Sequence, residues 1–193
     1  MGMVTEMRLP GGGGEPGTRF NYRGMHRYLI TLLAHPSCTS LGEKETVIPT
    51  LDVLRASCHA HFFEVYAYCF LPDRLVLLVR GKEESSDMKV FLTAFRKDSE
   101  SAHGLRGGKH LWSKKYQERV LRKTEVTRAI ADEVFRLPAK AGLAPGPDRY
   151  EYQGSFVLPG IPPPRPRGGI PPGRKGRPPF RRAGGKIRKT GRT

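Results

Sequence analysis

The stretch Ala67–Val79, AYCFLPDRLVLLV, constrains the fold of this 193-residue chain more than any other. Two apolar runs flank a Leu-Pro-Asp turn, which is the pattern of a β-hairpin. The first run begins at Phe63 and is apolar or aromatic at both alternating positions. Strands of this kind are buried on both sides. The sequence therefore predicts that the hairpin lies at the centre of a sheet and is covered on both faces.

Alternation of side chains along each strand predicts which residues share a face of the sheet. For the strand Phe63–Leu71, one face is expected to carry Val65, Ala67, Cys69 and Leu71, and the other Tyr66, Tyr68 and Phe70. For the strand Arg74–Arg80, Leu75, Leu77 and Val79 are expected to oppose Arg74, Val76 and Leu78.

Hydrophobic spacing and capping signals predict the remaining elements. Residues 26–34, HRYLITLLA, predict a first strand. One helical stripe is formed by Val47, Leu51, Leu54 and Cys58, with Pro49 expected in the first turn. A second helix, capped by Ser86 or Asp87, is expected to bury Met88, Phe91, Leu92 and Phe95. A short strand is expected around Arg119–Arg122. It precedes a third helix, which Thr124 caps and which ends at Pro138 and Gly142. This helix is expected to bury Val126, Ile130, Val134 and Leu137.

This element order, β-α-β-β-α-β-α, predicts an α+β fold: a ferredoxin-like βαββαβ core with an antiparallel sheet and one added C-terminal helix. We place this domain at residues 20–156, after a flexible Gly-rich segment at residues 1–19. Residues 157–193 form a region rich in Pro, Gly and Arg. Such a region cannot bury enough apolar surface to form a core, so we expect a tail that is disordered or ordered by a partner.

Positive charge is concentrated in that tail. The net charge of +16 and a pI near 10.2 indicate a polyanionic partner, nucleic acid before an anionic membrane. Residues 160–193 contain eleven Lys and Arg and no Asp or Glu, which leaves 23 basic and 18 acidic residues, a net charge of +5, in residues 1–159. We expect the tail to lie along phosphates; a merely solubilising tail is the alternative.

Cysteine usage and hydropathy indicate a compartment. Cys38, Cys58 and Cys69 form neither a CxxC pair nor a dense cysteine pattern, which argues against a disulfide scaffold. No apolar run approaches the ~20 residues that span a bilayer. The N-terminal residues lack the basic-then-apolar order of a signal peptide. We therefore expect a soluble, cytoplasmic protein without a membrane partner.

Three segments resemble one known family in their order and spacing: FEVYAYCFLPDRLVLLV, LWSKKYQERVLRKTEV and VFRLPAKAGLAPGPDRYEYQGS. They are similar to the central hairpin, the basic Trp-containing segment and the C-terminal stretch of the REP-associated tyrosine transposases. These are single-tyrosine HUH enzymes with an IS200-like transposase domain. The resemblance covers residues 20–156 and implies the fold, a structured single-stranded DNA substrate and a divalent metal such as Mg or Mn.

The catalytic positions that the resemblance implies are altered in this chain. In the family, two histidines spaced two residues apart on a strand bind the metal, and a helix-borne tyrosine attacks the phosphate. Here the metal positions carry Arg74 and Val76, and the tyrosine position carries Glu133. Valine has no donor atom, and arginine is permanently charged. We therefore expect no catalytic residue, no metal and no cofactor.

Relocated catalytic residues are the alternative. His59 and His61 form a lone His-x-His, but residues two apart on a helix point about 200° away from each other. Tyr116 lies among basic residues and is a candidate nucleophile, against the simpler interpretation of a stacking or core aromatic. Under this alternative the chain is a metal-dependent single-strand DNA nickase or transposase.

Arg74 allows two interpretations. Its guanidinium could occupy the vacated metal position and hold a phosphate by a forked contact. It could instead pair with Glu133, because the two positions face each other in the family.

We rank three functions. The first is a domesticated transposase-like domain, monomer or homodimer, that binds structured single-stranded DNA or RNA without cleavage; a special case is a component of a ribonucleoprotein such as the ribosome, with ribosomal RNA and proteins as partners. The second is the active nickase, and the third is a protein-interaction module that uses IPPPRPR as a polyproline helix. The expected nucleic-acid contacts are basic residues and one tyrosine: Arg74, Lys114, Lys115, Tyr116, Arg119, Arg122, Lys123, Arg165, Arg167, Arg174, Lys175, Arg177, Arg181, Arg182, Lys186, Arg188, Lys189 and Arg192.

Overall fold

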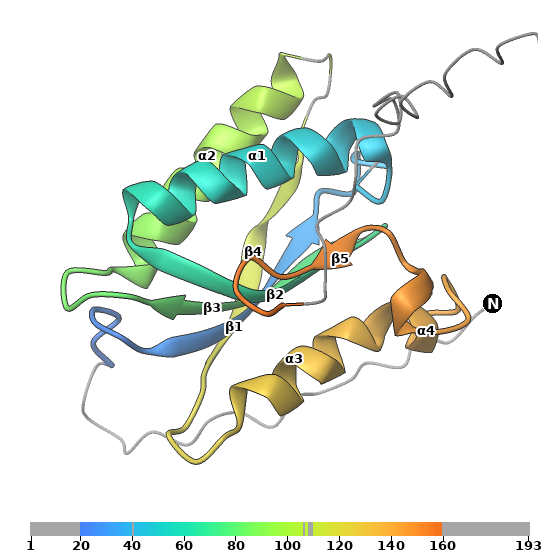
Figure 1. Ribbon diagram of the computed structural model, residues 1–193. Helices are drawn as coiled ribbons and strands as arrows, with labels where there is room; N and C mark the ends of the chain where they lie inside the picture. Colours follow the sequence, from blue (N-terminus) through green and yellow to red (C-terminus); the bar gives the residue numbers. More distant parts are fainter. Residues whose placement is uncertain (1–19, 40, 106, 108–109, 160–193) are drawn as a thin grey trace, which may run out of the picture.

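The computed structural model describes residues 20–39, 41–105, 107 and 110–159 (Figure 1). Its elements are β1 (Arg27–Ala34), α1 (Lys44–Ala60), β2 (Phe63–Leu71), β3 (Arg74–Gly81), α2 (Met88–Gly104), β4 (Trp112–Val120), α3 (Thr127–Phe135), α4 (Leu137–Lys140), a 3-10 turn (Pro147–Arg149) and β5 (Gln153–Gly154). The strands form one sheet in the order β4-β1-β3-β2-β5, and every pairing is antiparallel. The expected ferredoxin-like α+β fold is confirmed, with the short β5 at one edge. None of the described helices is long and apolar enough to cross a membrane.

The face of the sheet beneath α1 and α2 holds the larger core (Figure 1). The α2 residues predicted to face inward are all buried there: Met88, Phe91, Leu92 and Phe95. The rings of Phe63 and Phe91 stack with centroids 4.5 Å apart, and Phe95 continues the row 6.5 Å from Phe91. Aromatic packing therefore joins α2 to the start of β2.

The opposite face, beneath α3, holds a smaller apolar cluster. Its members come from β2, β3, α3 and the loop that precedes α3: Ala67, Cys69, Leu71, Val76, Leu78, Leu121, Ile130, Ala131, Val134 and Phe135. Helix α3 packs mainly against β2 and β3. Burial raises the pKa of the Cys69 thiol to about 12, so this cysteine behaves as an inert core residue.

The predicted alternation fails at one point of β2, where a β-bulge lies at Tyr66. The extra residue inverts the alternation on its N-terminal side. Val65 therefore shares a face with Tyr68, and Tyr66 lies on the face of Ala67. The predicted faces of Val65 and Tyr66 are wrong, whereas those of the other residues in the hairpin are confirmed.

Two boundaries also differ from the predicted ones. The fourth strand spans Trp112–Val120 rather than residues 119–122. It is an edge strand exposed to water, and its Lys, Gln and Glu residues conceal the strand pattern. Thr124 caps no helix: α3 begins after Val126, which is 65% exposed rather than inward. The chain then breaks between α3 and α4 at Arg136, instead of continuing as one helix.

Of the two predicted capping residues, Ser86 and Asp87, it is Asp87 that caps α2. Its carboxylate accepts the backbone N–H groups of Lys89 at 3.0 Å and Val90 at 3.2 Å. Burial opposes the charged form of Asp87, but these bonds and a contact with Arg23 hold its pKa below the ordinary value. Pro49 is tolerated inside α1, although it lies in the second turn rather than the first.

Candidate nucleic-acid interface

The two positions that the resemblance assigns to metal ligands lie on β3, the strand that follows the hairpin turn. Val76 is 5% exposed and belongs to the apolar cluster that contains Ile130, Ala131 and Val134. Valine offers no donor atom, and its neighbours are hydrocarbon. Among the residues that the structure describes, no group of three or more His, Cys, Asp or Glu side chains could hold a metal ion. These residues do not fit the divalent metal of the family.

Arg74 is held by its neighbour in the sequence. Its Nε and one terminal nitrogen donate to the Asp73 carboxylate at 3.0 and 2.6 Å, and these hydrogen bonds raise the pKa of the guanidinium. Glu133 is exposed on α3. Of the two interpretations of Arg74, pairing with Glu133 is therefore wrong, because the Asp73 carboxylate of the hairpin turn accepts from the guanidinium instead. The Arg74 side chain remains 41% exposed.

The two histidines of the His-x-His do not converge. His59 is exposed in the last turn of α1 and lines a pocket there. His61 is the C-cap residue, and its ring lies edge-on to Phe91 with centroids 6.5 Å apart. This arrangement gives no support to the interpretation of His59 and His61 as metal ligands.

Tyr116 faces α2, on the side of the sheet opposite to Val76. Lys89 donates to its hydroxyl at 3.0 Å and also to the Glu118 carboxylate, which accepts a further hydrogen bond from Tyr22 at 2.6 Å. Burial opposes the charged form of Glu118, but these bonds hold its pKa below the ordinary value. Tyr116 is thus part of a hydrogen-bonded polar cluster, which favours a structural role over a nucleophilic one.

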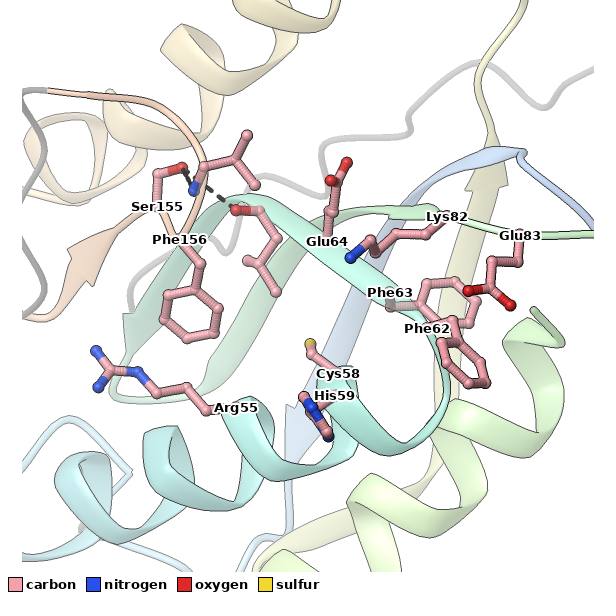
Figure 2. A pocket seen from close by; sticks show the side chains of 12 residues that line it. Arg55, Cys58, His59, Phe62, Phe63, Glu64, Lys82, Glu83, Ser155 and Phe156 are labelled. Atoms are coloured by element: carbon pink, nitrogen blue, oxygen red, sulfur yellow. Dashed lines mark hydrogen bonds between the residues drawn. The ribbon is translucent and has the colours of Figure 1, made fainter. Parts of the chain in front are cut away.

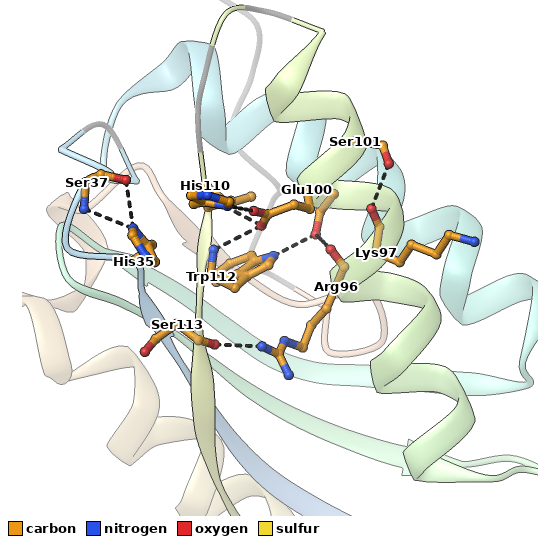
Figure 3. A network of polar contacts seen from close by, with 11 residues as sticks. His35, Ser37, Arg96, Lys97, Glu100, Ser101, His110, Trp112 and Ser113 are labelled. Atoms are coloured by element: carbon orange, nitrogen blue, oxygen red, sulfur yellow. Dashed lines mark hydrogen bonds and ion pairs between the residues drawn. The ribbon is translucent and has the colours of Figure 1, made fainter.

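A second polar network fixes the start of β4 (Figure 3). The Glu100 carboxylate accepts the backbone N–H of Trp112 at 3.1 Å, and the indole N–H of Trp112 donates to Ser99 at 2.8 Å. Two predicted contacts, Lys114 and Lys115, follow on the same strand and are exposed. The network therefore anchors the edge that presents these lysines.

Five basic residues gather on the α3 side of the sheet, at the end of β1 and β3 far from the hairpin turn. Arg27 on β1 and Arg80 on β3 are register partners, and the end of β4 and its loop add Arg119, Arg122 and Lys123. We call these five residues the basic strip. Three of them were predicted contacts; Arg27 and Arg80 were missed. Arg80 could have been predicted, because alternation along β3 puts it on the same face as Arg74.

The charges of the basic strip are engaged to different degrees. The Arg27 guanidinium donates to the backbone carbonyls of Arg122 and Glu125, both at 2.7 Å, and Arg119 pairs with the Glu125 carboxylate at 2.5 Å. These two arginines hold the loop between β4 and α3. Arg80, by contrast, has no ion-pair partner within the described residues, and the side chains of Arg122 and Lys123 are exposed. Three cations of the strip are therefore available to a ligand.

The remaining predicted contacts lie outside the described residues, together with segment 1–19. They are the tail residues Arg165, Arg167, Arg174, Lys175, Arg177, Arg181, Arg182, Lys186, Arg188, Lys189 and Arg192.

Comparison with known proteins supports the fold. No family model and no curated protein matches the sequence. The solved structure of a REP-associated tyrosine transposase bound to a REP hairpin is similar, with a TM-score of 0.56 and 17% identity over 70% of this chain and 79% of that one. A candidate transposase from Deinococcus radiodurans R1 gives a TM-score of 0.41 and 18% identity over 64% of this chain and 97% of that one. The first likeness shows that the chain has the fold of a REP-associated transposase, as the sequence predicted.

Proposed function

We propose that this chain is a nucleic-acid-binding protein that uses a transposase-like fold to hold structured single-stranded DNA or RNA without cleaving it. One observation carries the proposal: on the α3 face, apolar packing surrounds Val76 where the family has a metal ligand, while Arg80, Arg122 and Lys123 present available cations on the same side. The transposase of similar fold is bound to a REP hairpin. A hairpin that carries a single strand is therefore the first ligand to test.

Phosphate contacts account for the expected affinity. Each Lys or Arg that neutralises a phosphate releases counterions, so binding weakens as salt rises. Arg74 can add a forked contact, because its exposed pair with Asp73 contributes only about 0–1 kcal/mol and a phosphate can displace it. The eleven basic residues of the tail add affinity that does not depend on sequence.

Fluorescence anisotropy with a labelled hairpin tests binding. The same hairpin is prepared as DNA and as RNA, with a blunt duplex as control, and titrations are repeated from 50 to 300 mM salt, roughly the range over which such contacts weaken. We expect binding at low salt that falls steeply as salt increases. Absence of binding to either hairpin at low salt contradicts the proposal.

Cleavage is tested with the same hairpins in Mg²⁺ or Mn²⁺, followed by denaturing electrophoresis. We expect neither a shortened strand nor a covalent adduct, and binding that chelation of divalent metals leaves unchanged. Metal-dependent cleavage that is lost in Tyr116→Phe would instead establish the nickase.

A place in a ribonucleoprotein is the special case of this proposal, motivated by the basic tail. Copurification of the protein with RNA at high salt is the expected result. A particle whose size and protein partners survive nuclease treatment unchanged argues against this special case, without affecting the binding experiments above.

A further inference from the structure

A pocket of about 730 Å³ opens at the edge of the sheet formed by β2 and β5 (Figure 2). It lies between the end of α1, the start of β2, the loop after β3 and the segment after β5. Sites for small ligands typically have volumes of about 300–1,000 Å³. Neither Val76 nor Tyr116 lines this pocket, so it is separate from both positions discussed above.

Phe62 forms one wall of the pocket and holds an unusual backbone conformation. Its φ is +58°, which is an outlier for a bulky side chain, and the residue is 44% exposed. The conformation is fixed from behind, because its carbonyl accepts the backbone N–H of Lys82 and the hydroxyl of Ser86, both at 2.8 Å. Strained residues that the surrounding structure holds in place are concentrated at binding sites. The fold thus presents an aromatic face to solvent instead of burying it.

A second flat surface lies on the other side of the pocket, where Figure 2 shows Phe156 beside Arg55. The guanidinium carbon of Arg55 is 4.9 Å from the centre of the Phe156 ring. The backbone N–H of Phe156 donates to the carbonyl of Val65 at 3.0 Å, which fixes the segment against β2. Aromatic rings and guanidinium planes are the two surfaces on which unpaired bases stack.

Polar groups beside these walls suit the edge of a base. Glu83 contributes a carboxylate, which only accepts hydrogen bonds, and Lys82 contributes an ammonium group that can reach a phosphate. Glu64 lies at the rim, where its carboxylate accepts a hydrogen bond from the Tyr66 hydroxyl at 3.2 Å. Adenine, cytosine and guanine carry exocyclic amino groups that donate to such carboxylates. Thymine and uracil carry no amino group. The lining therefore favours an amino-bearing base.

The sheet register places one residue of the pocket next to the basic strip. Glu64 on β2 is the partner of Arg80 on β3, and Arg80 is the partner of Arg27 on β1. Neighbouring strands lie about 4.8 Å apart, so the backbone of β2 at Glu64 is one strand spacing from the backbone of β3 at Arg80. A strand whose phosphates contact the basic strip can reach the pocket without crossing the molecule.

We infer that this pocket binds one unpaired, amino-bearing nucleobase of the strand whose phosphates lie on the basic strip. The inference rests on the proposed function and adds to it a binding site for a single-stranded base at the β2–β5 edge. Stacking on Phe62 and hydrogen bonds to Glu83 select the base, and Arg55 and Lys82 are placed to meet its flanking phosphates.

The test uses the full chain and three DNA hairpins: one blunt, one with a five-nucleotide adenine extension, and one with a five-nucleotide thymine extension. We expect the adenine extension to be bound about tenfold more tightly than the thymine extension, within the range of base stacking. Phe62→Gly should abolish this preference and leave affinity for the blunt hairpin unchanged. Since Gly adopts a positive φ freely, the variant should keep or raise its melting temperature, which a purely structural Phe62 would not allow.

Two further variants complete the design. Glu83→Gln should reduce the preference for adenine, whereas Phe20→Ala, which removes an exposed aromatic elsewhere, should preserve it. A preference that persists in Phe62→Gly overturns the inference. If the wild type binds all three hairpins equally, only the pocket assignment fails; if it binds none, the proposed function fails as well.

Discussion

The two faces of the sheet are built differently. Beneath α1 and α2, a row of aromatic rings packs against the strands, and the charged groups at its rim pair within the fold, as Lys89 does with Glu118. Beneath α3, the apolar cluster is smaller, and beside it Arg80 has no ion-pair partner among the described residues. The first face holds the larger buried cluster, and under the proposed function the second presents charge to a ligand.

Phe91→Ala tests the larger core and should have the largest effect. The ring lies in the stacked row between Phe63 and Phe95 and is fully buried. Its removal leaves a cavity, so we expect a loss of about 3–5 kcal/mol in the free energy of unfolding, measured with urea. Phe135→Ala, the same truncation in the smaller cluster beneath α3, should cost less than Phe91→Ala, near the lower end of that range. Equal losses at the two sites would contradict the division between the faces.

Val76→His tests whether a histidine can still be accommodated at the position of the family's metal ligand. The position is packed by α3, so an imidazole overfills it and buries polar atoms; we expect a loss of about 1–3 kcal/mol in the free energy of unfolding. Lys115→His, at an exposed position of β4, should change stability by less than about 0.5 kcal/mol. Addition of Mn²⁺ should not raise the melting temperature of an Arg74→His, Val76→His double variant. A metal-dependent rise would mean that the site can still be formed.

Sequence reasoning predicted the hairpin, the order of the elements along the chain and a cap at Ser86 or Asp87, because each depends on a local pattern of apolar or capping residues. It missed the bulge at Tyr66, since one extra residue leaves no mark in a strand that is apolar on both faces. It also shortened β4, whose exposed side chains hide the strand period. At the candidate site it could name Arg74 but not its partner. The choice between Asp73 and Glu133 depends on the path of the turn, which spacing alone does not specify.

Acid should destabilise the α2 face through Asp87. The folded state holds the pKa of this carboxyl below its ordinary value of about 3.9, so the unfolded chain binds the proton more tightly. The associated stability is present above that ordinary value and is lost as pH falls through the folded pKa. Asp87→Ala should cost about 1 kcal/mol at neutral pH. Asp87→Asn keeps the cap without titrating, so urea unfolding of this variant should depend less on pH between about 5 and 2 than that of the wild type. If the wild type and Asp87→Asn lose stability in parallel as the pH falls, Asp87 does not contribute to acid destabilisation.

Arg80→Ala should have the smallest effect on stability and a clear effect on binding, which separates the two faces most directly. Arg80 makes no ion pair within the described residues, so its loss should change the free energy of unfolding by less than about 0.5 kcal/mol. If it contacts a phosphate, hairpin affinity should fall and the slope of log K against log salt should become shallower by about one. Lys97→Ala removes the same charge from an exposed position on α2 and serves as the control. Because net charge is equal in the two variants, equal loss of affinity would show that general charge, rather than the basic strip, determines binding.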